Sequence, residues 1–462
     1  MQVSKPIENL NFPNKKLNIS ILQSQKLFNK NTAFVISLSS QDKMERESDV
    51  DLLCVIDISG SMKGNKLNKI KLSLKTIISF MTPKDRLCII LFNDNAKIYL
   101  NLAFMTDETK KQYLEKIEKI TAKGGTNILS GLKKAFEILI DDKKNENNNE
   151  PMEEMRVKTV ILLSDGYDND YDTEEIVDEV KKITKGQNLS FTLHTFGYGD
   201  DYDSKLMSKL ALIRDGTFNA VEDVDKIQEY FVNALGGCMS TIYQELKIKI
   251  NMLKESYKIK NVFGKDKLFQ FELNNNLNNF SFSNLQIISG KEYTYVFEVE
   301  LPDIIQMNEN IFEVEFIADN NETFKEICKY KVVGGAFSIA DEEYLKNRLY
   351  DTLNEAMELK EQKKTEQMNI LLNGMKDWIE KNYEGINKKD YLKKLNEALG
   401  LFKDDYTFQR YGRSRITADI YENQLKRGGV NLMYSNKYQN NMISVSKTNS
   451  NRTAGFRPLN IP

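Results

Sequence analysis

The sequence contains few of the residues that most often build metal centres, redox sites and catalytic triads. Its 462 residues include one histidine, one tryptophan and four cysteines. The cysteines, at 54, 88, 238 and 328, are widely spread and lack the paired spacing that suggests a zinc or redox motif. The single histidine, His194, lies in a predicted buried strand, which favours a structural role over a catalytic one. Scattered thiols of this kind indicate a reducing compartment, so we expect a cytoplasmic protein.

Long apolar runs are also missing, and the net charge is small. No apolar run approaches the roughly 20 residues of a membrane span, and the first six residues lack the apolar core of a signal peptide. The 65 basic and 67 acidic side chains nearly balance, so the overall charge indicates neither a nucleic-acid nor a membrane partner. From Tyr406 onward, however, nine basic residues stand against two acidic ones. This basic tail is either a solubilising terminus or a segment that lies along an acidic partner.

The middle of the chain alternates between strands and helices. Short, wholly apolar runs such as 52–56 and 160–163 predict strands that are buried on both faces. Segments with the apolar spacing of a helix, such as 67–78, lie between these runs. The alternation predicts an α/β domain at residues 49–240, with a doubly wound, mostly parallel sheet and helices on both faces.

The parts on either side of this domain follow other patterns. Residues 241–335 contain strands without helices, which predicts an antiparallel β-sandwich, and residues 1–48 contain two strands that cannot form a domain alone. We therefore expect the α/β domain to be inserted between two parts of one sandwich. Three amphipathic stripes predict helices at 336–405 that form a small bundle or pack on the sandwich. Residues 406–462 are predicted to be a basic, partly extended tail, since the stretch from Arg427 has few apolar residues.

Oxygen-bearing side chains follow the first of the buried strands. Asp57, Ser59 and Ser61 come directly after the run 52–56, and Gly60 lets the backbone turn sharply between the hydroxyls. In doubly wound sheets, ligands bind at the carboxyl ends of strands where the strand order reverses. Taken alone, this segment is also consistent with a turn whose hydroxyls cap the next helix.

Two later segments supply further oxygens. Thr126 lies in Gly-Gly-Thr-Asn at 124–127, and Asp165 follows the buried strand 160–163. We predict that three segments converge on one metal ion, held by Asp57, Ser59, Ser61, Thr126 and Asp165. Oxygen-only ligands suit a hard cation, so the expected ion is Mg²⁺, with Ca²⁺ or Mn²⁺ as alternative occupants.

The three motifs together resemble the metal-ion-dependent adhesion site of von Willebrand factor type A domains. The matching pieces are Asp-Ile-Ser-Gly-Ser-Met at 57–62, Gly-Gly-Thr-Asn at 124–127 and Leu-Ser-Asp-Gly at 163–166. The resemblance covers residues 49–238 closely. In looser form it extends to intracellular members with a flanking β domain and a helical C-terminal region. Some plant members carry a RING finger, but four scattered cysteines and one histidine cannot build one, so ubiquitin-ligase activity is not implied.

The resemblance implies a role for each site residue. Ser59, Ser61 and Thr126 would contact the metal, and Asp57 and Asp165 would contact it directly or through water. A vacant coordination position would then accept a carboxylate from a partner, which is how the family commonly binds ligands. The implied protein is a non-enzymatic, intracellular binding or scaffold module that captures an acidic residue of a protein partner.

Two other functions stay open. A metal-dependent hydrolase would use the ion to activate water, although no general base stands out in the sequence beside the site. A structural subunit of a larger assembly would keep a vestigial metal site and use its helices and tail for contacts. The nucleophile elbow is missing, because Asp57 and not glycine stands two residues before Ser59, and residues 60–66 lack the Walker spacing.

Acidic residues crowd the segment after Asp165. Four of them fall at the positions of a calcium loop: Asp168, Asp170, Asp172 and Glu179. Thr173 stands where such a loop needs glycine, and the alternative is that Asp172 caps a helix with Glu175 completing a capping box. These aspartates, with those at 200, 201 and 203, are also expected to rim the metal face. We hypothesise that the partner presents one carboxylate within a basic surface, and a solvated acidic loop without function is the alternative.

Overall fold

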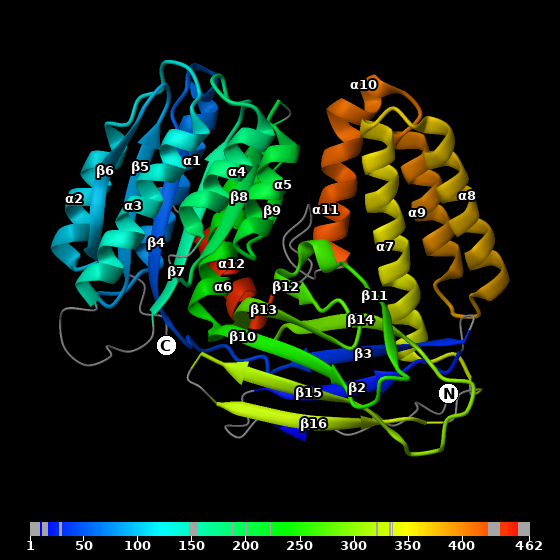
Figure 1. The fold of residues 1–462 in the computed structure, drawn as a ribbon. Helices are drawn as coiled ribbons and strands as arrows, with labels where there is room; N and C mark the ends of the chain where they lie inside the picture. The colour runs from blue at the N-terminus through cyan, green and yellow to red at the C-terminus, as the bar shows by residue number, and fades with distance from the viewer. Residues whose placement is uncertain are drawn as a thin grey trace. The chain divides into compact units, whose positions relative to one another are not determined.

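The chain forms two compact units in the computed structural model, each assembled from segments far apart in the sequence (Figure 1). The β/helical unit contains residues 1–41, 245–284 and 291–426, and the α/β unit contains 42–244, 285–290 and 427–462. The structure describes residues 10–11, 17–26, 30–146, 156–185, 189–199, 201–221, 223–319, 322–331, 334, 336–423 and 435–450. Along the chain the α/β unit therefore interrupts the other, as the sequence predicted.

The α/β unit is built on a six-stranded sheet with the order β6-β5-β4-β7-β8-β9, in which only β6 is antiparallel to its neighbour. Its strands are β4 (Asp49–Asp57), β5 (Arg86–Phe92), β6 (Ala96–Phe104), β7 (Arg156–Ser164), β8 (Thr192–Tyr198) and β9 (Phe218–Val221). Its helices are α1 (Asn65–Phe80), α2 (Asp107–Glu118), α3 (Ile128–Glu146), α4 (Thr173–Thr184), α5 (Ser204–Ile213), α6 (Ile227–Met239) and α12 (Lys437–Ser450). The predicted fold class is confirmed.

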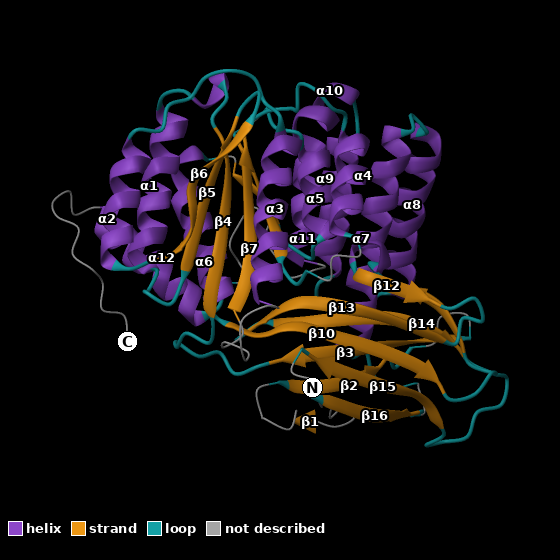
Figure 2. Cartoon of the chain, turned by 60° about the vertical axis from the view of Figure 1, so that its left-hand side comes forward, coloured by secondary structure: helices purple, strands orange, loops and turns teal. Residues whose placement is uncertain are grey.

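Both faces of this sheet are covered, which agrees with the apolar runs in its central strands β4, β5 and β7. Helices α1, α2, α6 and α12 share one core with Leu52, Cys54 and Ile56 of β4. Figure 2 shows α3, α4 and α5 on the other side of the sheet. Strand β4 pairs with β5 on one side and β7 on the other, so the strand order reverses at β4. The carboxyl end of β4 is therefore the place where a ligand site is expected.

Residues 437–450 form helix α12, which corrects the prediction of an extended or disordered segment for that part of the stretch from residue 427. Helix α12 packs against α6 and buries three apolar side chains in the core of the sheet: Tyr438, Met442 and Ile443. A Cβ on Gly236 of α6 would lie 3.1 Å from Cγ of Gln439, so glycine permits this close approach. The apolar residues of α12 are spaced for one helix face but are surrounded by Asn and Ser, which concealed the pattern.

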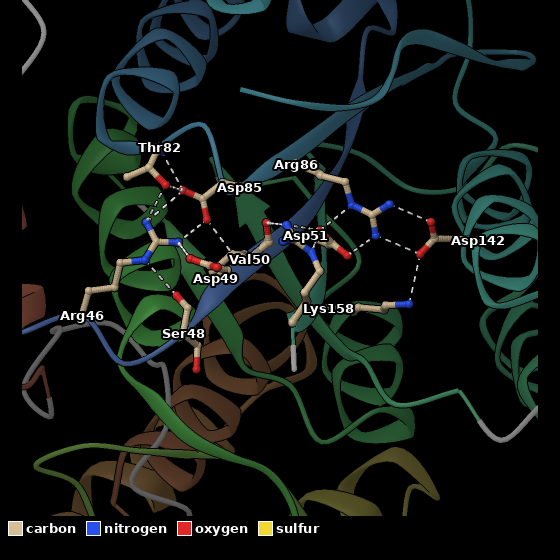
Figure 3. Close-up of polar contacts among 11 residues, drawn as sticks. Arg46, Ser48, Asp49, Val50, Asp51, Thr82, Asp85, Arg86, Asp142 and Lys158 are labelled. Carbon is tan, nitrogen blue, oxygen red and sulfur yellow. Dashed lines mark hydrogen bonds and ion pairs between the residues drawn. The ribbon is translucent and has the colours of Figure 1, made fainter. Parts of the chain in front are cut away.

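A buried polar network lies at the amino ends of the central strands (Figure 3). Asp51 accepts from Nε of Arg86 at 2.8 Å and is 2.8 Å from Nη2 of Arg156. Asp85, whose side chain is fully buried, accepts from Nη1 of Arg46 at 2.9 Å. Because an unpaired charge at this depth is strongly destabilising, each carboxylate needs its guanidinium partners. The network holds the end of the sheet opposite to the predicted metal ligands.

The β/helical unit contains two antiparallel sheets of five strands, ordered β1-β2-β3-β14-β11 and β12-β13-β10-β15-β16. The strands are β1 (Leu10–Asn11), β2 (Asn18–Gln23), β3 (Asn31–Ser39), β10 (Thr241–Met252), β11 (Lys258–Val262), β12 (Phe269–Leu273), β13 (Asn279–Ile288), β14 (Glu292–Glu300), β15 (Asn310–Ala318) and β16 (Thr323–Lys329). Strand β3 pairs with β14, so the N-terminal strands complete a sheet of the later segment. The sheets meet through phenylalanines, with the ring centroids of Phe34 and Phe312 5.0 Å apart.

The helical region of this unit extends further than the sequence predicted. Helices α7 (Ile339–Glu361), α8 (Thr365–Asn382) and α9 (Lys388–Leu401) correspond to the three predicted stripes, and α10 (Asp405–Thr407) and α11 (Arg413–Asn423) follow. Phe408, Ile416 and Ile420 are buried in the core of these helices, so the basic tail was assigned to begin too early. Basic residues pair within the chain here, as Arg413 does with Glu361. In the part of the chain that the structure describes, no helix has both the length and the apolar character to cross a membrane.

Candidate metal-binding site

Asp57 ends β4 with its carboxylate fully buried. Its Oδ1 accepts from the N–H of Ser59 at 2.7 Å, and its Oδ2 accepts from Oγ of Ser164 at 2.6 Å. The parallel register explains the second bond, since it places Ile56 opposite Leu163 and thus brings Asp57 beside Ser164. Burial raises the pKa of Asp57 to about 6, although the bonds from Ser164 and Ser59 counter part of the effect.

The two serines after β4 reach the end of β7. Oγ of Ser59 lies 3.0 Å from Oγ of Ser61, and Oγ of Ser61 donates to Oδ1 of Asp165 at 2.7 Å. Asp165 is 2% exposed and follows β7 directly. Four of the five predicted ligands therefore form one connected cluster at the carboxyl ends of β4 and β7.

Thr126 is joined to the same cluster by backbone contacts. The N–H of Gly60 donates to the carbonyl of Gly124 at 2.9 Å, which ties its segment to the one after β4. The N–H of Thr126 donates to Oδ1 of Asn169 at 2.6 Å, and the N–H of Asn169 donates to the carbonyl of Thr126 at 2.9 Å. Oγ1 of Thr126 is the nearest atom to the position of a Cβ on Gly166, at 3.9 Å. The three predicted segments thus meet.

Lys66, in the first turn of α1, also belongs to the site, and the sequence analysis missed it. Its ammonium contacts Oδ2 of Asp165, whose other oxygen is bound by Ser61. The carbonyl of Lys66 accepts from the Tyr198 hydroxyl at 3.5 Å. A lysine in the first turn of the helix that follows Ser61 was the available signal, since that turn begins beside the site.

The donor chemistry of the cluster fits a hard divalent cation. It comprises two buried carboxylates, two serine hydroxyls and one threonine hydroxyl, and oxygen donors of this kind suit Mg²⁺. Among the described residues, no three His, Cys, Asp or Glu side chains form a group that could hold a metal ion. A metal ion in this cluster would therefore need the hydroxyls as ligands beside the two carboxylates. Burial raises the pKa of Asp57, and the nearby Asp165 adds to the effect; a cation bound beside both carboxylates would favour their charged forms.

The acidic segment after Asp165 serves local structure. Asp172 caps α4, with its Oδ1 accepting from the N–H of Glu175 at 2.9 Å and Glu175 completing a capping box, so that prediction is confirmed. Glu179 lies 3.1 Å from the ammonium of Lys133. This ion pair accounts for the position of the Glu179 carboxylate without a calcium ion. Oδ2 of Asp168 accepts from the N–H of Ile128 at 2.6 Å, in the first turn of α3. The acidic rim remains a prediction, and its residue 200 lies outside the described residues.

The single histidine and the four cysteines are buried. His194 is buried in β8, with Nδ1 2.8 Å from Oγ1 of Thr217 and Nε2 3.2 Å from Oγ1 of Thr192. All four cysteines are buried as free thiols.

A mostly parallel, doubly covered sheet with a hydroxyl and carboxylate cluster where its strand order reverses defines a doubly wound α/β domain. The family model for the von Willebrand factor type A domain matches residues 51–233. This segment of the chain is therefore a von Willebrand factor type A domain.

Similar proteins share this domain over part of their length. An uncharacterized protein from Synechocystis sp. is 28% identical over 182 residues, which are 39% of this chain and 40% of that protein. The inter-alpha-trypsin inhibitor heavy chain H2 from Homo sapiens is 33% identical over 172 residues, 35% of this chain and 17% of that one. The chain thus spans less than half the length of these relatives.

Two solved structures resemble most of the chain. A von Willebrand factor type A protein from Catenulispora acidiphila superposes with a TM-score of 0.64 at 17% identity, covering 86% of this chain and 91% of that one. The ArnB paralog VWA2 from Sulfolobus acidocaldarius gives a TM-score of 0.51 at 15% identity, covering 85% of this chain and 96% of that one. At such identities the likeness shows a shared fold.

Proposed function

We propose that the α/β unit is a non-enzymatic binding module that captures a carboxylate of a protein partner through a bound Mg²⁺. The observation that carries the proposal is the chain of contacts from Asp57 through Ser59 and Ser61 to Asp165. It brings side chains from the ends of two parallel strands into one cluster of oxygens. Thr126 stands on a third segment that is hydrogen-bonded to the other two.

Each group would have a distinct part in binding. Asp57 and Asp165 would balance the charge of the cation, and Ser59, Ser61 and Thr126 would supply neutral oxygens. A magnesium ion held by neutral hydroxyls and few carboxylates stays electrophilic and can bind a further oxygen from outside. The Ser164 bond to Asp57 and the Asn169 bond to Thr126 would hold the ligands in position.

The proposal extends to location. Four free and buried thiols are consistent with a reducing compartment, which supports the proposal of a cytoplasmic protein. A fluorescent fusion of the full chain in its native cells tests this placement. Fluorescence confined to the cell surface or the medium would contradict it.

Calorimetric titration of the full chain with MgCl₂ tests metal binding. Asp57→Ala and Thr126→Ala are expected to abolish the binding heat, because each removes an oxygen from the cluster. Asp225→Ala and Thr121→Ala are matched controls on exposed residues, and they are expected to bind Mg²⁺ as the unaltered chain does. Equal binding by all four variants would overturn the site.

Affinity of the full chain for a short aspartate-containing peptide, measured with Mg²⁺ and with chelator, separates this function from its alternatives. The proposal expects binding only with Mg²⁺ and none by Asp57→Ala. Metal-independent recovery of a cellular partner by both forms would favour the structural subunit, for which the Lys66 contact to Asp165 is the supporting observation. Hydrolytic turnover that Asp57→Ala abolishes would favour the hydrolase.

A further inference from the structure

A pocket of about 360 Å³ lies between the β5–β6 turn and the segment that follows α2. The pocket adjoins the candidate metal site, because Ile58, which lies between Asp57 and Ser59, forms part of its wall. The N–H of Lys123 donates to the carbonyl of Ile58 at 2.8 Å, and Nδ2 of Asn93 donates to the carbonyl of Lys123 at 2.8 Å. The backbone on this side of the pocket is therefore fixed to the ends of β4 and β5.

The charged side chains that line the pocket are all positive. Lys97, Lys119 and Lys123 line it, and no carboxylate does. Within the described residues, none of these three lysines forms an ion pair, although many other lysines of the chain do, such as Lys69 with Asp225. The ammonium of Lys97 lies 5.6 Å from the centroid of the Tyr99 ring.

Apolar groups form the rest of the lining. Ile58, Leu91 and Ile120 contribute side chains that are otherwise buried, and Tyr99 is held in place by its hydroxyl bond to the carbonyl of Lys116 at 2.7 Å. A pocket with apolar walls and ammonium groups suits a side chain with an aliphatic stem and an anionic end. Glutamate has that form.

The surface on the two sides of the candidate metal site thus differs in charge. Beyond Asp165 the chain places Asp170 and Asp172 in exposed positions, whereas the β5–β6 side presents the three unpaired lysines. Asp94, in the β5–β6 turn, is an exposed carboxylate on that side, and its Oδ1 accepts from the N–H of Gly125 at 2.9 Å. An acidic chain approaching the metal is repelled from one side and attracted to the other.

We propose that this pocket is a second anchoring site for the protein partner and takes an acidic side chain, glutamate by its shape, near the carboxylate that binds the metal. The inference rests on the proposed function, since it assigns the orientation and charge of the same partner. It replaces the expectation of a lone carboxylate in a basic surface with two acidic side chains on one polypeptide segment.

Fluorescence anisotropy of the full chain with labelled glycine–serine peptides in Mg²⁺ tests the proposal. One peptide carries a single aspartate, and the others carry in addition a glutamate at varied distances from it. At the best distance we expect the second acid to tighten binding by roughly threefold to tenfold. We expect this gain to disappear at high salt, because the lysines are exposed.

Matched charge variants test whether the lysines of the pocket cause the gain in affinity from the second acid. The double variant Lys119→Gln, Lys123→Gln is expected to lose the gain, while its binding of the single-aspartate peptide changes little. The control Lys111→Gln, Lys181→Gln removes the same amount of charge from exposed positions on α2 and α4. This control is expected to retain the gain in affinity. With isoleucine methyl labelling, the two-acid peptide is expected to shift the Ile120 resonance and the single-aspartate peptide is not.

The contrary outcomes distinguish failure of the pocket, of the assigned ligand and of the metal-dependent function. A gain that is absent at every distance, or that both double variants retain, overturns the pocket and leaves the metal site intact. Inorganic phosphate or a nucleotide that shifts Ile120 more strongly than any peptide overturns the assignment to a polypeptide partner. Peptide binding that does not require Mg²⁺ or Asp57 overturns the proposed function itself.

Discussion

The ammonium of Lys66 contacts Oδ2 of Asp165, so the protein places one of its own cations against a predicted metal ligand. A positive charge beside this carboxylate opposes a second cation electrostatically. We therefore expect Lys66→Met to tighten Mg²⁺ binding by about tenfold, or about 1.4 kcal/mol, as measured by calorimetry.

Two further variants isolate the charge of Lys66. Lys66→Arg is expected to bind Mg²⁺ as the unaltered chain does. Lys69→Met removes a lysine of the same helix that lies 2.8 Å from Asp225, and it is expected to have no effect. Weaker binding by Lys66→Met would show that the lysine organises the site and does not compete for it.

Asp51 lies between two guanidinium groups at the amino ends of the central strands. Asp51→Asn leaves Arg86 and Arg156 without their shared carboxylate, and we expect the free energy of unfolding of the α/β unit to fall by about 3 kcal/mol. Hydrogen exchange of the β4 and β5 amides, followed in increasing urea, measures the loss. Asp141→Asn, at an exposed pair with Lys144, is the matched control and is expected to change little. A loss of similar size in both variants would contradict the assigned role.

Two helical glycines are expected to respond in opposite ways to alanine. A Cβ on Gly374 of α8 meets nothing within 4 Å, so Gly374→Ala is expected to stabilise the helix by about 0.5–1 kcal/mol. A Cβ on Gly236 would lie 3.2 Å from Cα of Gln439, so Gly236→Ala is expected to loosen α12.

The two glycine variants need different measurements. Fluorescence of Trp378, the single tryptophan, reports unfolding around α8. Hydrogen exchange at 437–450 reports release of α12. Unchanged exchange in Gly236→Ala would show that α6 and α12 can separate slightly without loss of the contact.

The buried thiols are expected to be unreactive in the folded protein. Burial raises the pKa of Cys88 to about 12 and raises the pKa values of Cys54 and Cys328. Because the thiolate is the reactive form, a higher pKa means less reaction at mildly alkaline pH. We expect a thiol reagent to titrate none of the four cysteines in the native chain and all four in denaturant without reductant. Fewer than four in denaturant would reveal a disulfide.

Much of the fold could be predicted because local patterns agree with it. The run 52–56 is apolar at every position, and only a strand covered on both faces explains such a run beside amphipathic helices. The convergence of Thr126 and Asp165 on Asp57 followed from the motifs and from the rule that ligand sites lie where strand order reverses. The helix at 437–450 was not predicted, since its few apolar residues are buried only because the helix packs against α6.

The sequence by itself determined the sheet, the helices around it and the oxygen-bearing residues at its carboxyl edge, because these depend on periodicity and on residues close together in the chain. Only the tertiary structure decided which charges meet across long distances. It brought Lys66 to Asp165 and placed Lys97, Lys119 and Lys123 around one pocket, where no described carboxylate pairs with them. Such pairings depend on the packing of α1 and on the β5–β6 turn, which no local pattern specifies.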